Sequence, residues 1–260
     1  MDWAGRWATS IRATSRERLN SGLFWDRRVN ITGPSPFLRA MTSDQIKIIA
    51  PSPHHNILEI GPGNGRLTIP LAQLSASVTS IDPSPLMLRS LSERAREEGL
   101  TNLRLINDCW ENVDVAGMGR FDKIVSSFSI FMLDIEEQIR RMDSIADKVY
   151  LFVPADLRIP FAVQEILFGR IVVEHTDFEI LSNIAEDLGL KPITFTMDYP
   201  ERACFDNLEV AMEHYFDFYG VPDEKKELVA ENLRSTILQK GGQFTTNGSR
   251  NVGVIWWQNS

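Results

Sequence analysis

Short apolar segments alternate with helix-like segments between residues 56 and 154, and this alternation constrains the fold more than any other feature of the chain. Such alternation predicts parallel strands joined by right-handed crossover helices, which cover both faces of a single sheet. Ligands of these sheets bind at the carboxyl ends of the strands, near the point where the strand order reverses. The predicted strands are residues 56–60, 77–82, 102–108, 121–129 and 148–154, and the helices between them are residues 66–75, 84–99 and 135–147.

The pattern becomes looser after residue 154, where predicted helices dominate. A strand, a long helical excursion and a closing strand predict an antiparallel hairpin at the sheet edge, with helical material inserted above it. Residues 1–50 are also predicted to be mostly helical, with a break at residues 32–36. The late helices are residues 161–173, 178–190, 206–219 and 223–239, and the late strands are residues 191–200 and 251–258.

Length and charge limit the kinds of partner. A chain of 260 residues suits one medium-sized domain with insertions. The net charge of −8 disfavours a nucleic-acid partner, because phosphates require a concentrated positive surface. Cys109 and Cys204 stand in no metal-ligand spacing, so we expect a reducing, cytoplasmic setting and no metal. No apolar run is long enough to span a bilayer, and we expect no membrane partner.

A glycine loop follows the first predicted strand. Glu59, Gly61, Gly63 and Gly65 form the pattern E-x-G-x-G-x-G, in which glycines permit positive φ and leave the backbone open to a ligand. The nicotinamide dinucleotide of an oxidoreductase requires a small residue where Arg66 stands, because the helix must approach the strand there. An acidic Glu59 would repel a pyrophosphate but attract the ammonium group of S-adenosylmethionine. The loop therefore favours S-adenosylmethionine.

This pattern resembles motif I of the class I S-adenosylmethionine-dependent methyltransferases. The resemblance is good over about residues 55–155 and loose elsewhere. It implies a Rossmann-like α/β fold with a mostly parallel seven-stranded sheet, helices on both faces, an antiparallel last strand, a helical N-terminal segment and a helical insert before the last strand. Within a single domain 1–260, residues 51–155 would be the cofactor-binding core, residues 1–50 a helical lid or substrate segment, and residues 156–260 the substrate-side helices and closing strands.

The resemblance also implies individual cofactor contacts. Asp82, at the end of the second strand, would accept hydrogen bonds from both ribose hydroxyls. Pro83 and Met87 would flank the adenine, and Asp108 would take its amino group. The remaining implied contacts are Pro62 in the glycine loop, Cys109 and Trp110 along the adenine ring, Ser127 and Phe128 near the reactive methyl, and Trp25 in a segment folded over the cofactor.

Several of these assignments have a purely structural alternative that the sequence leaves open, and Glu59 could be a surface acid. Asp82 could cap the helix that starts at residue 84, and Asp108 could be an ordinary loop acid. Trp110 and Trp25 could serve only in packing, and Cys109 could be a small apolar filler.

Tryptophans near both ends of the chain predict packing surfaces. Trp3, Trp7 and Ile11 fall at helical spacing, which indicates a helix packed on the domain by its tryptophan face. Trp256 and Trp257 are expected either in the core of the sheet or in a homodimer contact.

The acceptor of the methyl group is less well defined than the cofactor. LEIGPGNGRLTIPLA is similar to the ribosomal-RNA adenine dimethylases, but SSFSIF lacks the proline-containing motif with which those enzymes hold an amine. A small molecule or a modified side chain is therefore favoured as acceptor, and S-adenosylhomocysteine is the expected second product. His175, His214 and Tyr215 are candidate bases, although only some nucleophiles need one. A sensor that binds S-adenosylmethionine without turnover is the alternative.

Overall fold

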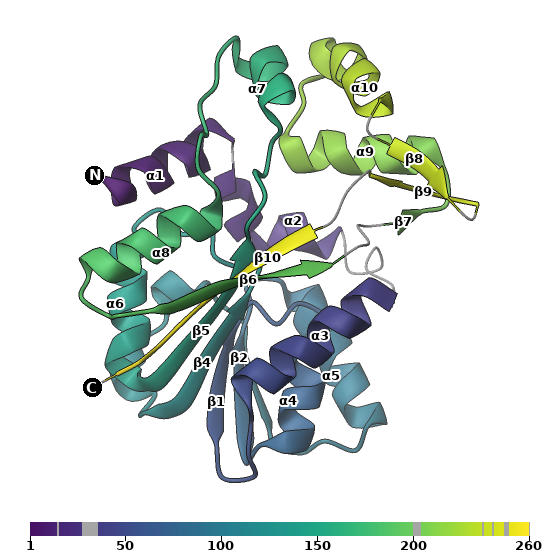
Figure 1. Cartoon of the computed structure of the whole chain (residues 1–260). Helices are drawn as coiled ribbons and strands as arrows, with labels where there is room; N and C mark the ends of the chain where they lie inside the picture. Colours follow the sequence, from purple (N-terminus) through teal and green to yellow (C-terminus); the bar gives the residue numbers. More distant parts are fainter. Residues whose placement is uncertain are drawn as a thin grey trace.

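The structure is a computed structural model that describes residues 1–14, 16–27, 36–199, 204–235, 237–240, 242–246 and 250–259. Within them, seven strands form one sheet in the order β3-β2-β1-β4-β5-β10-β6 (Figure 1). Only β10 runs antiparallel to its neighbours, so the predicted sheet and its edge hairpin are confirmed. The strands are β1 (Asn56–Ile60), β2 (Ser77–Ile81), β3 (Leu103–Ile106), β4 (Phe121–Ser127), β5 (Ala146–Pro154), β6 (Ile193–Tyr199) and β10 (Arg250–Gln258).

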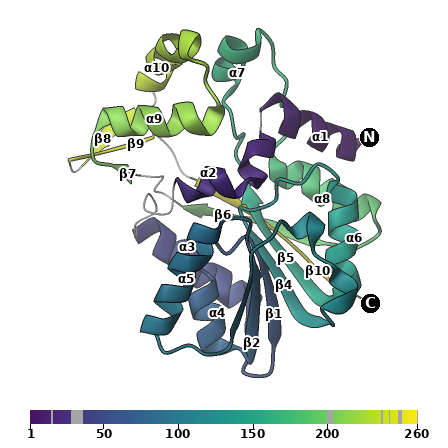
Figure 2. The same cartoon turned by 180° about the vertical axis from the view of Figure 1, so that it is seen from behind.

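Helices cover both faces of the sheet, as predicted (Figures 1 and 2). One face packs against α1 (Trp3–Ala13), α6 (Ile135–Ile145) and α8 (Asp177–Asp187). The other face packs against α3 (Pro36–Ile49), α4 (Thr68–Leu74) and α5 (Pro85–Glu97). None of the helices in the described part of the chain combines the length and the apolar composition that crossing a bilayer requires.

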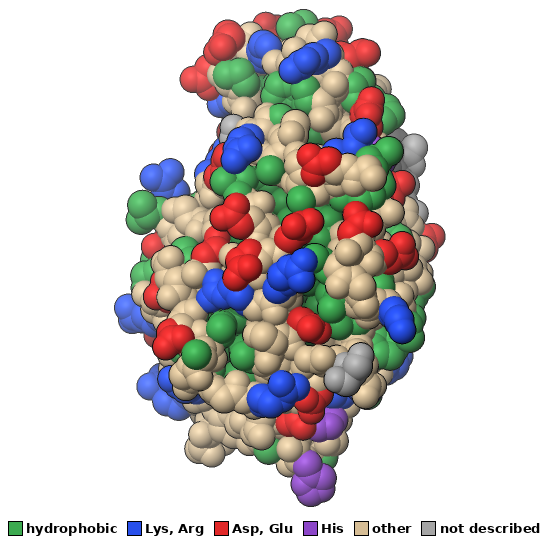
Figure 3. All heavy atoms as spheres, turned by 90° about the vertical axis from the view of Figure 1, so that its left-hand side faces the viewer, with side chains coloured by type: hydrophobic (Ala, Val, Ile, Leu, Met, Phe, Trp, Pro, Cys, Tyr) green, Lys and Arg blue, Asp and Glu red, His purple; other side chains and the backbone are tan. Residues whose placement is uncertain are grey.

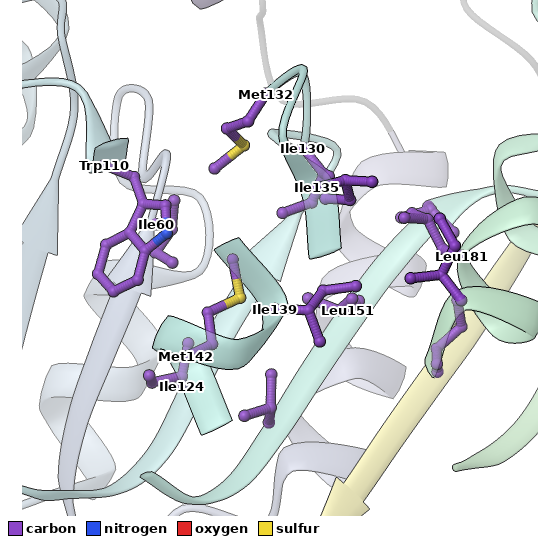
Figure 4. Packing of buried hydrophobic residues seen from close by; sticks show 14 of the residues in the cluster. Ile60, Trp110, Ile124, Ile130, Met132, Ile135, Ile139, Met142, Leu151 and Leu181 are labelled. Carbon is purple, nitrogen blue, oxygen red and sulfur yellow. The ribbon is translucent and has the colours of Figure 1, made fainter. Parts of the chain in front are cut away.

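The larger core cluster joins the strands to α6, α8 and α1. Figure 4 shows Ile124 of β4 and Leu151 of β5 beside Ile139 of α6. The indole nitrogens of two buried tryptophans find acceptors: Trp7 donates to the Met132 carbonyl at 2.7 Å, and Trp257 donates to Asp143 at 2.9 Å. Burying both rings with their polar atoms satisfied makes them core residues, which confirms the packing role predicted for Trp7 and places Trp257 in the sheet core.

A cap lies above the sheet in Figure 1 and has its own apolar cluster. Leu167, Phe216 and Val229 meet in that cluster, one from each of its three helices. A three-stranded antiparallel sheet completes the cap. Its elements are α7 (Phe161–Phe168), α9 (Leu208–Tyr219), the 3₁₀ helix η4 (Asp223–Lys225), α10 (Lys226–Arg234), β7 (Cys204–Phe205), β8 (Ile237–Lys240) and β9 (Gln243–Thr246).

Two helices of this region were predicted too long. The helix predicted over residues 223–239 ends at Arg234. Residues Ile237–Lys240 instead form strand β8, which pairs with β9. Gly242, which has φ +85°, lies between the two strands. The helix predicted over residues 161–173 ends at Phe168, because Gly169 adopts the left-handed conformation that terminates helices.

Candidate functional site

A cavity of about 1250 Å³ opens where β1, β2 and β4 end at their carboxyl termini. It exceeds the volume of about 300–1,000 Å³ that is usual for one small ligand. Its walls come from the glycine loop and the ends of β2 and β4, from the N-terminal segments α2 (Gly22–Asp26) and α3, and from α9 of the cap. The cavity therefore has room for two ligands side by side, one against the loops and one under the cap.

The glycine loop owes its shape to positive φ angles. Gly61 has φ +71°, its N–H donates to the Ile81 carbonyl at 2.9 Å, and a Cβ at this position would overlap the side chain of Ser129. Gly63 has φ +55°, and a Cβ added there would meet no atom within 4 Å. Gly61 thus permits close packing, while Gly63 leaves bare backbone open to the cavity.

Glu59 lies beneath this loop and is buried. Thr68 donates a hydrogen bond of 2.6 Å to its carboxylate. Burial raises the pKa of Glu59 to about 7, against the opposing effects of the Thr68 hydrogen bond and of nearby Arg66. The Glu59 carboxyl group is therefore close to half-protonated at neutral pH.

Asp82 stands at the end of β2, where the sequence predicts the ribose-binding acid. One carboxylate oxygen accepts from the Gly63 N–H at 3.1 Å and the other from the Ser84 N–H at 2.8 Å. Burial raises the pKa of Asp82, although these two backbone hydrogen bonds oppose the shift. An ionised carboxylate has about four acceptor sites, so acceptor capacity remains for a ligand. Ser84, rather than Asp82, caps α5 by accepting from the Met87 N–H at 3.0 Å.

The residues predicted to surround the adenine divide into two groups. Pro83, Met87 and Trp110 line the cavity, as does Pro62 of the glycine loop. Trp110 is buried, the guanidinium of Arg141 lies 5.0 Å from its ring centroid, and its indole nitrogen has no hydrogen-bond partner among the described residues.

Asp108 and Cys109 are not among the described residues that line the cavity. Asp108 instead accepts hydrogen bonds of 2.8 Å from the Cys109 N–H and from the side chain of Asn112. These local bonds stabilise the turn before the 3₁₀ helix η2 (Trp110–Asn112), which matches the alternative of an ordinary loop acid.

The end of β4 brings Ser127 and Phe128 to the cavity, beside the cofactor loop. Phe128 has φ +60°, a conformation that costs energy in a bulky residue and is fixed here by a hydrogen bond of 2.8 Å from its N–H to the Phe152 carbonyl. The strained turn directs the chain out of the sheet at the point where the methyl group is predicted to lie.

Arg66 was missed as a site residue, and it joins three elements at this point. Its guanidinium donates to Thr42 at 2.9 Å and to Gln45 at 2.8 Å, both on α3, and to Ser127 at 2.7 Å. Burial lowers the pKa of Arg66 to about 10, so the group is cationic at neutral pH. The signal in the sequence was a charged residue directly after the glycine loop, where the dinucleotide-binding pattern has a small one.

The N-terminal segment contributes part of the cavity wall and is bonded to α5. Asp26, at the end of α2, accepts from the Ser84 hydroxyl at 2.6 Å and from the Leu86 N–H at 3.3 Å at the start of α5. Trp25 lines the cavity, stacks on Phe131 with ring centroids 6.4 Å apart, and donates to the Leu19 carbonyl at 2.6 Å. Figure 2 shows α2 between the cap and α5.

The candidate bases lie in different places. His214 and Tyr215 line the cavity from α9, and the His214 ring stacks on Phe218 with centroids 6.1 Å apart. His175 lies elsewhere, in a smaller pocket beside α1, where its ring meets the edge of Trp3 at 5.1 Å. His175 is thus separated from the predicted cofactor contacts. In the described part of the chain, no three His, Cys, Asp or Glu side chains are grouped to hold a metal.

Residues 57–148, which build this loop and the sheet around it, match the family model described as a methyltransferase domain. This segment is a class I methyltransferase domain. Within the methyltransferase domain, S-adenosylmethionine is confirmed as the cofactor, whereas the individual contacts stay predictions.

Relatives of the methyltransferase domain differ in how much of the chain they match. A probable ribosomal RNA small subunit methyltransferase A from Methanosphaera stadtmanae is 38% identical over 74 residues, which is 28% of this chain and about a quarter (26%) of that protein. An uncharacterised protein from Haemophilus influenzae is 24% identical over 210 residues, covering 77% of this chain and 75% of its own length. The crystal structure of magnesium protoporphyrin IX methyltransferase from Synechocystis PCC 6803 with bound S-adenosylhomocysteine has a TM-score of 0.53 at 16% identity, covering 94% of this chain and 99% of that chain.

Proposed function

We propose that the protein transfers a methyl group from S-adenosylmethionine to a small molecule by in-line displacement. The observation that carries the proposal is the single cavity of about 1250 Å³, which spans the glycine loop, the end of β4 and the cap. Two ligands in one cavity can be aligned for direct attack, and alignment supplies much of the acceleration of a bimolecular reaction.

The cofactor half offers a fit for each part of S-adenosylmethionine. Gly63 presents open backbone, and Asp82 retains acceptor capacity for the two ribose hydroxyls. Pro83 and Met87 form an apolar wall for the adenine. When bound, the cofactor supplies an activated methyl group on a sulfonium.

The residues around the acceptor exclude water and orient it. Trp25 and Phe131 form a stacked pair on one side, and His214 and Phe218 form another under the cap. Excluding water favours methyl transfer, because the reaction disperses a positive charge that bulk water would solvate. His214 or Tyr215 would take a proton from an acceptor that must lose one.

We infer from this division of the cavity that residues 1–50 act as a lid, residues 51–155 as the cofactor core and residues 156–260 as the acceptor side. Asp26 supports the lid assignment, because it holds α2 against the start of α5. A cytoplasmic location remains part of the proposal, and it follows from the cysteine usage alone.

A ribosomal-RNA acceptor is the second candidate. The 38% identity to a probable ribosomal RNA small subunit methyltransferase A favours it. Against it stand the net charge of −8 and the absence, in SSFSIF, of the amine-binding motif expected after β4.

Two measurements test the proposal. Isothermal calorimetry should detect S-adenosylhomocysteine binding and no binding of NADH. Labelled S-adenosylmethionine, incubated with the protein and a small-molecule extract of cells, should give a labelled low-molecular-weight product together with S-adenosylhomocysteine. Cofactor binding without any labelled product would identify a sensor, and label found only in added ribosomal RNA would identify the second candidate.

A further inference from the structure

The cavity lining is basic, although the whole chain carries a net charge of −8. Two of the three acids among the described lining residues, Glu59 and Asp82, belong to the cofactor half. The third, Asp156, accepts hydrogen bonds of 3.0 and 2.8 Å from the backbone and side chain of Asn251. Basic residues therefore outnumber acidic ones in the described lining as a whole. The basic residues in the described lining are Arg39, Lys47, Arg66, Arg94, Arg158 and Arg250.

This excess is local to the cavity. On the face drawn in Figure 3, acidic and basic side chains are interspersed over the surface. A cleft with one sign of charge and apolar walls focuses the field and concentrates ligands of the opposite sign. An acidic protein with a basic cavity is thus suited to a small anion, and it is poorly suited to a large polyanion that must contact the surface as well.

Arg66 has donors to spare at the end of β4. A guanidinium has five N–H donors, and Arg66 uses three of them, on Thr42, Gln45 and Ser127. All three acceptors are neutral, and no ion pair formed by the described residues includes Arg66. Its Nε–H and one Nη2–H therefore remain for a ligand.

Arg250 lies close to the same point. Its guanidinium is 4.8 Å from the centroid of the Phe128 ring, at the carboxyl end of β4. Burial is the largest cause of the lowered pKa of Arg66, and the positive charge of Arg250 lowers that pKa further. Two neighbouring guanidiniums repel each other, and an anion between them reduces that repulsion.

Arg158 adds a third positive charge on the cap side. Arg158 and Arg16 share a single carboxylate, that of Asp177; Arg16 and Asp177 are buried, and Arg158 is partly buried. The cluster thus has one more positive than negative charge. Arg158 also lies over Phe131 and Phe218, at 5.2 and 5.9 Å from their ring centroids, so its charge faces the aromatic part of the cavity.

We propose that the methyl acceptor is a carboxylic acid with an apolar or aromatic body, and that its carboxylate binds between Arg66 and Arg250. A planar guanidinium can donate two parallel hydrogen bonds, and the two oxygens of a carboxylate, like those of a phosphate, can accept both. The apolar body then lies against Phe131 and Phe218, and the carboxylate anchors the molecule without being the attacking atom. The inference rests on the proposed methyl transfer.

The test begins by sorting a small-molecule cell extract by charge. The extract is passed over an anion exchanger at pH 7, and the flow-through and the retained fraction are each incubated with the protein and labelled S-adenosylmethionine. The label should appear with the retained fraction only. Amidation of that fraction with carbodiimide and ammonia should abolish labelling, and prior treatment with phosphatase should leave it unchanged.

Variants then locate the anion. Arg66→Gln and Arg250→Gln should each raise the amount of retained fraction needed for half-maximal labelling by at least about tenfold, the scale of one lost charged contact. The affinity of Arg250→Gln for S-adenosylhomocysteine, measured by calorimetry, should change less than about twofold, because Arg250 is not among the predicted cofactor contacts. Arg104→Gln, on the exposed side of β3, is the matched control and should behave as the unaltered protein.

Each other result overturns the inference. Labelling from the flow-through fraction would leave the methyltransferase proposal intact and refute an anionic acceptor. Loss of label after phosphatase would replace the carboxylate by a phosphate. Weaker S-adenosylhomocysteine binding in Arg66→Gln, with an unchanged requirement for the retained fraction, would assign the arginine to the carboxylate of the cofactor. No label from either fraction would refute the proposed function and this inference together.

Discussion

Glu59 and Asp82 are two buried acids beside one loop, and each is held by a different kind of partner. Thr68 donates to Glu59, whereas backbone N–H groups donate to Asp82. Burial raises the pKa of both groups. If the ammonium group of the cofactor binds beside Glu59, as the sequence predicts, it favours the ionised form, and we expect cofactor binding to release a proton from this residue.

Glu59→Gln should change how stability depends on pH. The pKa of Glu59 is about 7 in the folded chain, against a usual value of 4.5, so between these values the folded state holds a proton that the unfolded state has lost. The free energy of unfolding therefore falls as pH rises through this window, by up to about 3 kcal/mol for this group. Urea unfolding at pH 5, 6, 7 and 8 should show the variant gaining stability relative to the unaltered protein as pH rises. Parallel curves would contradict the raised pKa, and Glu97→Gln on the exposed face of α5 is the control.

Asp82→Asn should weaken S-adenosylhomocysteine binding by roughly 1.5–3 kcal/mol, the scale of hydrogen bonds to a charged group. Asp108→Asn should change it by less than about 0.5 kcal/mol, since Asp108 bonds only to its own turn and lies outside the cavity lining. Calorimetry on both folded variants measures the difference. Equal losses would restore Asp108 as a cofactor contact and leave the ribose assignment of Asp82 unsupported.

At the scale of elements, the proposed lid depends on the junction between α2 and α5. A carboxylate at a helix N-terminus interacts favourably with the helix dipole and with unpaired N–H groups, and Asp26 occupies that position on α5. A Cβ at Gly22 would overlap the Pro83 carbonyl, so α2 packs directly on the predicted adenine-binding turn. The lid and the cofactor half are thus coupled through a few atoms.

The Asp26→Asn variant should release S-adenosylhomocysteine about tenfold faster than the unaltered protein. The reason is the loss of the charge-assisted hydrogen bond that Asp26 accepts from Ser84. Stopped-flow measurement of intrinsic tryptophan fluorescence, to which the neighbouring Trp25 contributes, gives this rate. Glu17→Gln, on the exposed side of the preceding 3₁₀ helix η1 (Arg16–Asn20), is the control. A dissociation rate unchanged by Asp26→Asn would show that α2 does not hold the cofactor in place.

The sequence predicts the central elements well because their signals are local. β1 has the predicted bounds, and Gly99, with φ +68°, follows α5 in the left-handed conformation that was expected. The segment that forms β8 was predicted to be helical. Its pairing with β9 decides its conformation, and a local sequence pattern does not indicate which strand a segment will pair with. Arg66 was missed for a similar reason: its acceptors on α3 lie 21 and 24 residues away in the sequence.

At the scale of the whole molecule, one buried cluster joins the N-terminal segment to the acceptor side. Arg16 donates to Asp177 of α8 at 2.8 and 3.0 Å, and Arg158, which follows β5, donates to the same carboxylate at 2.5 Å. Burial alone would raise the pKa of Asp177, but the two arginines outweigh it and lower the pKa. The ionised Asp177 therefore stabilises the fold at pH values above the usual pKa of an aspartate, and this stabilisation is lost as the pH falls below that value.

Asp177→Asn should lower the free energy of unfolding by about 3–5 kcal/mol at pH 7, because it leaves two buried guanidiniums without a counter-charge. Urea unfolding measures the loss, which should shrink toward pH 3. Glu174→Gln is the matched control: its ion pair with Arg6 is 3.7 Å long and exposed, so the change should stay below about 1 kcal/mol. Equal effects of the two substitutions would contradict the central role of the cluster.

The place of β10 in the sheet bears on how the chain folds during synthesis. β10 is the last of the seven strands to leave the ribosome, yet it lies between β5 and β6. Until it emerges, β5 exposes an unpaired edge and β6 has no neighbour, and such edges promote aggregation. We therefore expect newly made chains to be most prone to aggregation before β10 is inserted.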